Sequence, residues 1–521
     1  MGVRTMAGKL TKRSVVLRGA VASMTAAALL AGGTATATPA RPPSRLRGPT
    51  GDLTGRQRAE WFEGQRHLEM VMRRLAPATA LAAPAVRPAA VSDVGTVQHV
   101  RRISRDTLPA QGSSEQDTQV EPDVAVDPNN DQIVVAVFQQ GRYPDGGSVD
   151  PGYATSHDGG VTWKHGNLPK LTKAVGGSFA RASDPAVAFG PDGSVYAQTL
   201  PFDSNDCRNG IAVQRSDDGG LTFAPPVLAQ DDTSCSYFND KNWIAVDTFA
   251  SSPHVGRIYS VWDRGDQNGQ PIVLKYSDGR GATWSSLINV SGASSQGIGA
   301  LPLVQPNGDL TVVYDRFSGA DTEVAQTSHD GGLTFDPAVV IGQFRGSEPS
   351  DMRTGGLPAA AVDPTTGHLF VAWQDTRFRS DGLNDIVLSS SSNGGATWSA
   401  LAKVNPDAQS KGIDHFTPAV AAYGGFVHVT YRTRAGGSSP SLYVGMRYRG
   451  SADEGATWGA ELTLGAPSDL TYAAQAGGKF LGDYMGLAAS ANAVHALWCR
   501  SAKPPVSEPY HQTAWTGEVV K

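Results

Sequence analysis

The feature that most constrains this chain is an eight-residue pattern that occurs six times. Each copy begins with Ser, has Gly at its fifth position and ends in Thr followed by Trp or Phe. The copies start at residues 156, 216, 277, 328, 391 and 451, so successive starts are 60, 61, 51, 63 and 60 residues apart. Such a period indicates a repeat architecture. The unit is too long for a solenoid coil and has the length of a propeller blade.

The residue types of the pattern indicate a self-closing hairpin. Its Ser and Asp can accept hydrogen bonds from nearby backbone N–H groups, and its Gly permits a positive φ. The final aromatic ring is an apolar anchor. We therefore assign a structural role to the residues at the third position, and expect weaker turns where Gly279 or Asn393 replaces the acid. These structural residues are Asp158, Asp218, Asp330, Asn393 and Asp453.

A second repeat, of paired apolar strands, accompanies the first. The pairs begin near residues 123, 186, 243, 301, 359, 419 and 485, and each has a turn rich in Pro, Asn, Asp or Gly. Seven pairs stand against six hairpin patterns, and one strand, 512–520, follows the last pair. Residues 96–103 could supply the missing outer strand and close the ring. The sequence thus favours an all-β propeller of seven four-stranded antiparallel blades, with six blades as the alternative.

The hairpin pattern resembles the Asp-box, or BNR repeat, of the sialidase (neuraminidase) superfamily. The resemblance covers roughly residues 96–521 and implies a β-propeller that acts on or binds carbohydrate. In that superfamily the Asp-box is a fold device set away from the catalytic face. The resemblance therefore implies an exo-α-sialidase-like glycoside hydrolase without establishing that the chain is an enzyme. A non-catalytic propeller that binds glycan or protein, and a polysaccharide lyase, are the alternatives.

The N-terminus is typical of an exported protein. Residues 1–37 combine a basic start, a short apolar stretch that includes Ala26 to Leu30, and a small-x-small site at Ala35-Thr36-Ala37. We expect a signal peptide and a secreted, soluble, monomeric protein without a membrane span. Residues 38–95 form a Pro/Ala-rich leader with one helix at 54–75, and 96–521 form the propeller. The net charge of −5 says little about partners over this length, but the absence of a basic run argues against nucleic acid.

The three cysteines suit an exported protein with few bridges. Cys207 and Cys235 lie in loops on one face of adjacent blades, so we expect them to form a disulfide, with Cys499 buried and unpaired. The histidines are scattered and no metal-ligand spacing is present. Calcium is conceivable at Asp127-Pro-Asn-Asn-Asp131, where a simple turn is the favoured interpretation, and no cofactor is otherwise expected.

Sorting the strands by face predicts where chemistry could occur. In an antiparallel blade, the start of the first strand and the end of the second share one face, and the hairpin pattern lies on the other. The first face collects acids at the starts of inner strands and charged residues after second strands, as concave binding sites do. The acids are Glu121, Asp184, Asp240 and Asp483, and the expected substrate-binding arginines are Arg142, Arg264, Arg316, Arg377 and Arg434.

The superfamily resemblance implies a mechanism for these residues. It calls for arginines that clamp a carboxylate, a Tyr nucleophile such as Tyr484, and an acid–base Asp on the loop before the first Asp-box. Asp145 and Asp150 lie on that loop. The candidate catalytic residues are thus Asp145, Asp150, Glu121, Asp184, Asp240 and Tyr484.

The chain departs from the superfamily at its first clamp position. Active sialidases open an early inner strand with Arg-Ile-Pro, whereas this chain has Val120-Glu121-Pro122, and no other blade opening has Arg two residues before Pro. Carboxylates near the axis would repel sialic acid. They suit a neutral or basic sugar, a cation or water better.

Overall fold

The computed structural model describes residues 70, 71, 73, 87–88, 95–317, 321–505 and 511–520. The expected signal peptide, 1–37, lies outside the described residues. Of the expected helix at 54–75, only Met70, Val71 and Arg73 are described, and their backbone is helical. Among the described residues, no helix has the length and apolar character needed to cross a bilayer.

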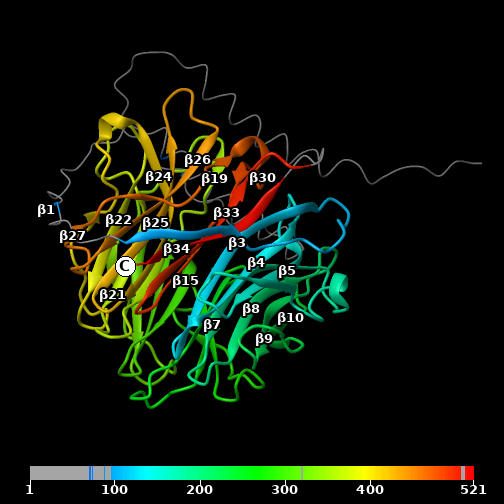
Figure 1. The fold of residues 1–521 in the computed structure, drawn as a ribbon. Helices are drawn as coiled ribbons and strands as arrows, with labels where there is room; N and C mark the ends of the chain where they lie inside the picture. The colour runs from blue at the N-terminus through cyan, green and yellow to red at the C-terminus, as the bar shows by residue number, and fades with distance from the viewer. Residues whose placement is uncertain are drawn as a thin grey trace, which may run out of the picture. The chain divides into compact units, whose positions relative to one another are not determined.

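The described chain is almost entirely β-strand and has a β-propeller arrangement (Figure 1). Consecutive strands pair antiparallel in sets of four. The first three sets are β3 (Glu115–Asp127), β4 (Asn130–Arg142), β5 (Ser148–Ser156), β6 (Lys164–Asn167); β7 (Arg181–Phe189), β8 (Val195–Phe202), β9 (Asn209–Ser216), β10 (Val227–Asp232); and β11 (Phe238–Val246), β12 (Ile258–Gly265), β13 (Ile272–Ser277), β14 (Ile288–Asn289).

The next three sets continue this pattern. They are β15 (Gly297–Val304), β16 (Leu310–Arg316), β17 (Thr322–Ser328), β18 (Val339–Gln343); β20 (Ala359–Val362), β21 (Leu369–Asp375), β22 (Asp385–Ser391), β23 (Ala402–Lys403); and β24 (Ile413–Tyr423), β25 (Phe426–Ala435), β26 (Tyr443–Ser451), β28 (Leu462–Thr463). The predicted paired strands all lie within these elements or the set that follows.

The final set joins the two ends of the described chain. It contains β32 (Gly486–Ala489), β33 (Ala493–Ser501) and β34 (Gln512–Val520), and its outer strand is β2 (Thr96–Arg102). Figure 1 shows the blue β2 beside the red β34. The sequence predicted this use of residues 96–103, which leaves β34 without a free edge.

The inner strands contact one another in cyclic order. β3 contacts β7, and the series continues through β11, β15, β20, β24 and β32 before returning to β3. The apolar core lies between neighbouring sets. One cluster, for example, joins Tyr259 and Leu274 of the β11 set to Val312 and Tyr314 of the β15 set. The inner strands of the seven sets therefore form a closed ring of contacts.

The remaining elements are short and connect or flank these sets. Two lie beside the pocket described below, namely β19 (Met352–Arg353) and β31 (Lys479–Phe480), which pair in parallel. The others are β1 (Arg87–Pro88), β27 (Thr457–Trp458), β29 (Ser468–Asp469), β30 (Ala474–Gln475), and the 3-10 helices η1 (Lys173–Val175), η2 (Gln409–Lys411) and η3 (Leu470–Tyr472).

The hairpin patterns form the hydrogen-bonded turns that their residues predict. Asp158 accepts from the Thr162 backbone N–H at 2.8 Å and from the Thr162 hydroxyl at 2.6 Å, and the Gly160 N–H donates to Ser156 Oγ at 2.8 Å. Asp218, Asp330 and Asp453 repeat these contacts. These turns and the propeller arrangement confirm the resemblance to Asp-box propellers.

The two altered hairpins differ from each other. Asn393 accepts from the Thr397 N–H at 3.0 Å and donates to its hydroxyl at 2.9 Å, so this turn keeps both links. In the copy with Gly279, the bond from the Gly281 N–H to Ser277 Oγ remains, at 3.0 Å, but a carboxylate acceptor is missing. The expected weakening therefore applies chiefly to Gly279.

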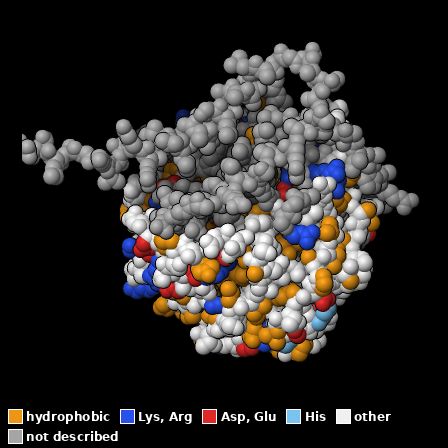
Figure 2. Space-filling view, turned by 180° about the vertical axis from the view of Figure 1, so that it is seen from behind, with side chains coloured by type: hydrophobic (Ala, Val, Ile, Leu, Met, Phe, Trp, Pro, Cys, Tyr) orange, Lys and Arg blue, Asp and Glu red, His pale blue; other side chains and the backbone are white. Residues whose placement is uncertain are grey.

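Cys207 and Cys235 form a disulfide, which is the expected pairing, and Cys499 is buried and free. Asp127 Oδ1 accepts from the Asn129 N–H at 2.8 Å in the tight β3–β4 turn, in accord with the turn interpretation of this stretch. On the face drawn in Figure 2, hydrophobic, charged and other side chains are interspersed across the described surface.

Candidate functional site

The site is positioned by a bulge that recurs in the inner strands. In five sets the pairing register shifts at this point, and the residue two positions before the ladder resumes has a positive φ. Such a φ is unfavourable for a residue with a Cβ, and bulges of this kind re-aim side chains next to functional sites. The residues at this position are Glu121 (φ 53°), Asp184 (47°), Lys241 (38°), Gly299 (72°) and Thr417 (48°).

Three of these bulge residues are charged, and they belong to the consecutive strands β3, β7 and β11. All three line one pocket. Its wall contains the carboxylates of Glu121, Asp145, Asp184, Asp240, Glu348 and Asp483, the cations of Arg142, Lys241 and Arg353, and apolar side chains that include Met70, Phe202, Phe238 and Leu357. The Asp-box residues are not part of this wall, as the sorting of the strands by face predicts.

Glu121 is a buried carboxyl group in the wall of the pocket. Its side chain is buried, and Gln139 Nε2 donates to its Oε2. Burial, together with the negative charges of Asp184 and Asp483, raises the pKa of Glu121 to about 8. Glu121 therefore carries a proton at neutral pH and can donate it.

Asp483 has the opposite environment, because a guanidinium group lies against it. Arg353 donates to both carboxylate oxygens, with Nη2 to Oδ2 at 2.5 Å and Nε to Oδ1 at 3.3 Å. The Arg353 guanidinium also lies 5.0 Å from the centre of the buried Phe480 ring, and that of Arg142 lies 5.2 Å from it. A forked ion pair of this kind fixes the orientation of both side chains.

Asp184 and Asp240 complete the acidic wall. The Ser183 hydroxyl donates to Asp184 Oδ1 at 2.7 Å, and Gln139 links this group to Glu121 because its Nε2 donates to Ser183 Oγ at 2.9 Å. Asp240 Oδ1 accepts from the backbone N–H of Lys241 at 2.9 Å. The pocket thus holds carboxyl groups with different partners, which is the condition for separate acid and base roles.

Lys241 places a buried ammonium group among these carboxyl groups. Its Nζ lies 4.2 Å from the centre of the Trp243 ring and 3.9 Å from that of Tyr484. Burial lowers the pKa of Lys241, and the charges of Asp184 and Glu121 oppose that shift. Nζ has no hydrogen-bond partner among the described residues.

Two other candidate catalytic residues lie apart from the pocket wall. Asp150 is fully buried in β5 and accepts from the Thr172 hydroxyl at 2.8 Å, and burial raises its pKa well above the usual range. The Tyr484 hydroxyl donates to the Pro185 carbonyl at 3.2 Å, and burial raises its pKa. The Tyr484 ring contacts Lys241, a residue of the pocket wall.

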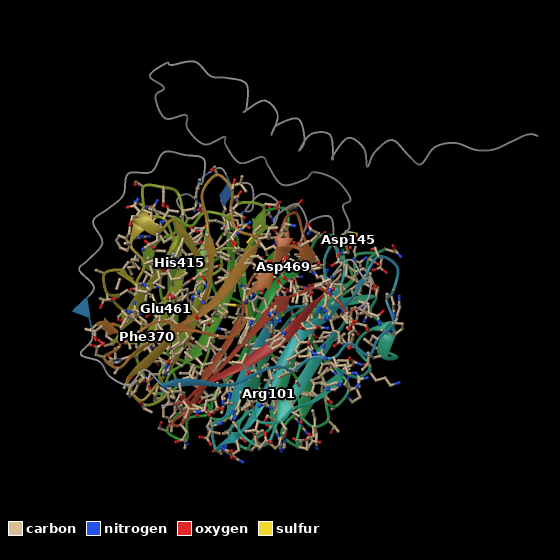
Figure 3. The ribbon with its side chains drawn as sticks, turned by 45° about the horizontal axis from the view of Figure 1, so that its top comes forward. Arg101, Asp145, Phe370, His415, Glu461 and Asp469 are labelled. Atoms are coloured by element: carbon tan, nitrogen blue, oxygen red, sulfur yellow. A yellow bond between two sulfur atoms is a disulfide. The ribbon has the colours of Figure 1, made fainter. Side chains whose placement is uncertain are left out.

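Asp145 lies in the β4–β5 loop (Figure 3), lines the pocket, and forms an ion pair with Arg181 at 2.6 Å. Of the expected substrate-binding arginines, Arg142 lines the pocket and the others do not. Arg264 pairs with Asp232, Arg377 with Asp375, Arg434 donates to the carbonyls of Ser350 and Ser441, and Arg316 ends β16.

Sequence reasoning missed Arg353 and Glu348. Glu348 accepts from the backbone N–H and the hydroxyl of Thr354, at 2.6 and 2.8 Å. Both residues lie in the stretch 344–358 between β18 and β20, which has no counterpart of similar sequence in the other repeats. The length of that connection is the only feature of the sequence that could have pointed to Arg353 and Glu348 as site residues. Among the described residues, no group of three or more His, Cys, Asp or Glu side chains is arranged to hold a metal ion.

Comparisons with known proteins give only structural similarities. No protein-family model matches the chain, and no curated protein matches its sequence. A protein of unknown function from Dyadobacter fermentans is similar at 17% identity and TM-score 0.44, over 67% of this chain and 99% of its own. A Hadza microbial sialidase is similar at 16% identity and TM-score 0.43, over 61% and 64% of the two chains.

A GH93 α-L-arabinofuranosidase of Fusarium graminearum, solved with arabinobiose, is similar at 14% identity and TM-score 0.42, over 64% of this chain and 93% of its own. At such identities the likeness concerns the fold. The similarities therefore assign no chemistry to the pocket.

Proposed function

We propose that this chain is a secreted carbohydrate-active propeller that hydrolyses glycosidic bonds in the acidic pocket. The observation that carries the proposal is that a buried carboxyl group with a raised pKa, Glu121, lines the same pocket as the ion pair between Asp483 and Arg353. Burial raises the pKa of Glu121 to about 8, so it keeps its proton at neutral pH, whereas Asp483 is ion-paired with Arg353. Most glycoside hydrolases use such a pair on the two sides of the scissile bond.

The roles follow from these environments. Glu121 protonates the leaving-group oxygen as general acid, and Gln139 orients it through the hydrogen bond to Oε2. Asp483 stabilises the positive charge that develops on the sugar ring, as nucleophile or as base. Strand β3, which carries Glu121, contacts β32, which begins three residues after Asp483.

The pocket favours a neutral or basic sugar over a sialic acid. Six carboxyl groups face three cations, and one of those cations, Arg353, is already paired with Asp483. Recognition of a sugar carboxylate by several arginines therefore lacks free partners here. A tyrosine nucleophile is also disfavoured, because the Tyr484 hydroxyl is buried against the Pro185 carbonyl.

We also propose that the propeller has seven blades and that the protein is exported. We count each four-stranded set as one blade, which gives seven blades, and the cyclic contacts of the inner strands support that number. Export is supported by the N-terminal sequence and by the Cys207–Cys235 disulfide, since disulfides are typical of oxidising compartments.

The test is a screen of the secreted protein on fluorogenic glycosides of neutral sugars, amino sugars and sialic acid. The matched variants are Glu121→Gln and Asp483→Asn, and the control is Glu323→Gln, which alters a fully buried glutamate outside the pocket wall. We expect release from a neutral or amino sugar, a kcat about 10²- to 10⁴-fold lower in Glu121→Gln, and an unchanged control.

Three outcomes would contradict parts of the proposal. Full activity of both pocket variants would place the catalytic groups elsewhere. Release from the sialoside alone would overturn the substrate class. If the wild type cleaves no member of the panel and retains glycans in a binding survey, the protein is a binding propeller rather than an enzyme.

A further inference from the structure

Lys241 is a buried cation whose side-chain nitrogen has no hydrogen-bond partner among the described residues. The side chain is only 5% exposed, yet it lines the acidic pocket. A buried ammonium group that forms no hydrogen bond is costly, because its three N–H groups have lost water and gained no acceptor. The backbone also holds Lys241 at φ 38°, so its position is strained as well.

Two aromatic rings flank the ammonium group of Lys241. The ring faces of Trp243 and Tyr484 attract the ammonium group, at 4.2 and 3.9 Å, but offer it no lone pair. The two rings themselves pack edge to face, with centroids 5.2 Å apart. The side chain is therefore fixed between aromatic rings at the wall of the pocket.

We propose that Lys241 binds an acceptor oxygen of the sugar in this pocket, a hydroxyl or ring oxygen of a neutral sugar, and thereby fixes its orientation. This inference rests on the proposed carbohydrate-active function. A sugar carboxylate is disfavoured as the acceptor because the acidic side chains of Asp184 and Asp483, which line the same pocket, would repel it. Lys241 is thus a specificity-determining residue beside the acid and the carboxylate.

The test compares Lys241→Met with wild type on the neutral glycoside that is released fastest, and on its monodeoxy analogues. A hydrogen bond from a charged donor contributes about 1.5–3 kcal/mol, so kcat/KM should fall about 10- to 150-fold. One deoxy analogue should show a similar loss with wild type and little further loss with Lys241→Met. Lys275→Met is the control, because Lys275 donates to the Ala229 carbonyl outside the pocket wall.

A second readout separates this inference from hydrolysis. An amine-reactive label, read by mass spectrometry, should modify Lys241 more slowly in the presence of the neutral sugar, with the rate at Lys275 unchanged. Protection without any hydrolysis would retain Lys241 as a sugar ligand and discard the catalytic proposal. Unprotected Lys241 together with an unaffected Lys241→Met variant would overturn the inference.

An independent observation concerns Met70, which reaches the pocket from the leader. Met70 is 2% exposed, lines the pocket, and packs in a cluster with Leu303, Phe344 and Trp373. Gly356 permits this close approach, because a Cβ at that residue would lie 2.7 Å from Met70 Cε. A leader side chain thus occupies space beside the proposed catalytic groups.

Polar contacts hold Met70 and Arg73 against the β15 set and the connection that follows it. Arg73 forms an ion pair with Asp321, and its Nη1 donates to the Phe344 carbonyl at 3.4 Å. The backbone N–H of Glu348, itself a pocket residue, donates to the Met70 carbonyl at 3.4 Å. We infer that Met70 and Arg73 form an internal latch that narrows the pocket and whose release gives larger substrates access.

The test uses the double variant Met70→Ala, Arg73→Ala, with Val71→Ala as control because Val71 does not line the pocket. We expect labelling of Lys241 and hydrolysis of an oligosaccharide of the preferred sugar to become several-fold faster in the double variant alone. Loss of stability would slow hydrolysis, so faster hydrolysis in the double variant cannot arise from misfolding. Unchanged labelling and hydrolysis, or a loss of both, would overturn the latch.

Discussion

The substitution Glu121→Gln should change the pH dependence of folding in a way that tests the site directly. Folding raises the pKa of the Glu121 carboxyl from 4.5 to about 8, through burial and then through Asp184 and Asp483. The folded state therefore binds more protons than the unfolded state between these two values. Stability must fall as pH rises through this window, and the effect is complete above the folded pKa.

The magnitude follows from the size of the shift. One pKa unit corresponds to 1.36 kcal/mol, so a shift from 4.5 to about 8 corresponds to about 5 kcal/mol. Glutamine keeps the shape and the neutral state but cannot ionise. Near pH 5 the variant and wild type should therefore have similar stabilities, and near pH 9 the variant should be more stable by several kcal/mol.

The assay is equilibrium unfolding in urea at pH 5, 7 and 9 for both proteins. The difference between the two proteins is the quantity to follow, because Asp123 and Glu115, whose pKa values burial raises to about 7, affect both equally. A difference that changes by less than about 1.4 kcal/mol between pH 5 and 9 would refute the protonated state of Glu121 and with it the general acid.

Three further outcomes follow from the structure. Gly279→Asp should raise the melting temperature slightly, because it restores the Asp-box acceptor and each new hydrogen bond contributes about 1 kcal/mol; an unchanged or lower value would contradict the role of that acid. Replacing Cys207 and Cys235 by serine should cost about 3 kcal/mol in denaturant unfolding, and equal stability under oxidising conditions would argue against the bridge. Arg353→Met should cost about 3 kcal/mol and abolish activity, because Asp483 is left buried without its partner; a fully active variant would remove Asp483 from the proposed mechanism.

Much of the fold followed from local patterns in the sequence. The Asp-box turns form through residues four positions apart, such as Asp158 and Thr162, so the pattern alone contains their chemistry. The alternation of apolar strands and turns likewise predicted the strand pairs, and the missing outer strand predicted the pairing of β2 with β34. Signals of this kind need no knowledge of distant contacts.

The sorting of strands by face also predicted which acidic residues would lie together. The face rule placed Glu121, Asp184 and Asp240 together, because it depends only on strand order, and all three line the pocket. The same rule could not tell which arginines face inward. Arg264 and Arg377 satisfy the rule, but both are paired with neighbouring aspartates outside the pocket wall.

The tertiary structure alone decided the electrostatics of the site. Arg353 reaches Asp483 across 130 residues of sequence, and Met70 packs against residues more than 200 positions later. Neither contact has a local signal, since each depends on how the ring closes. The sequence thus determined the repeating turns and strands, whose bonds are short in range, whereas ring closure determined which charges are buried together and therefore which carboxyl group keeps its proton.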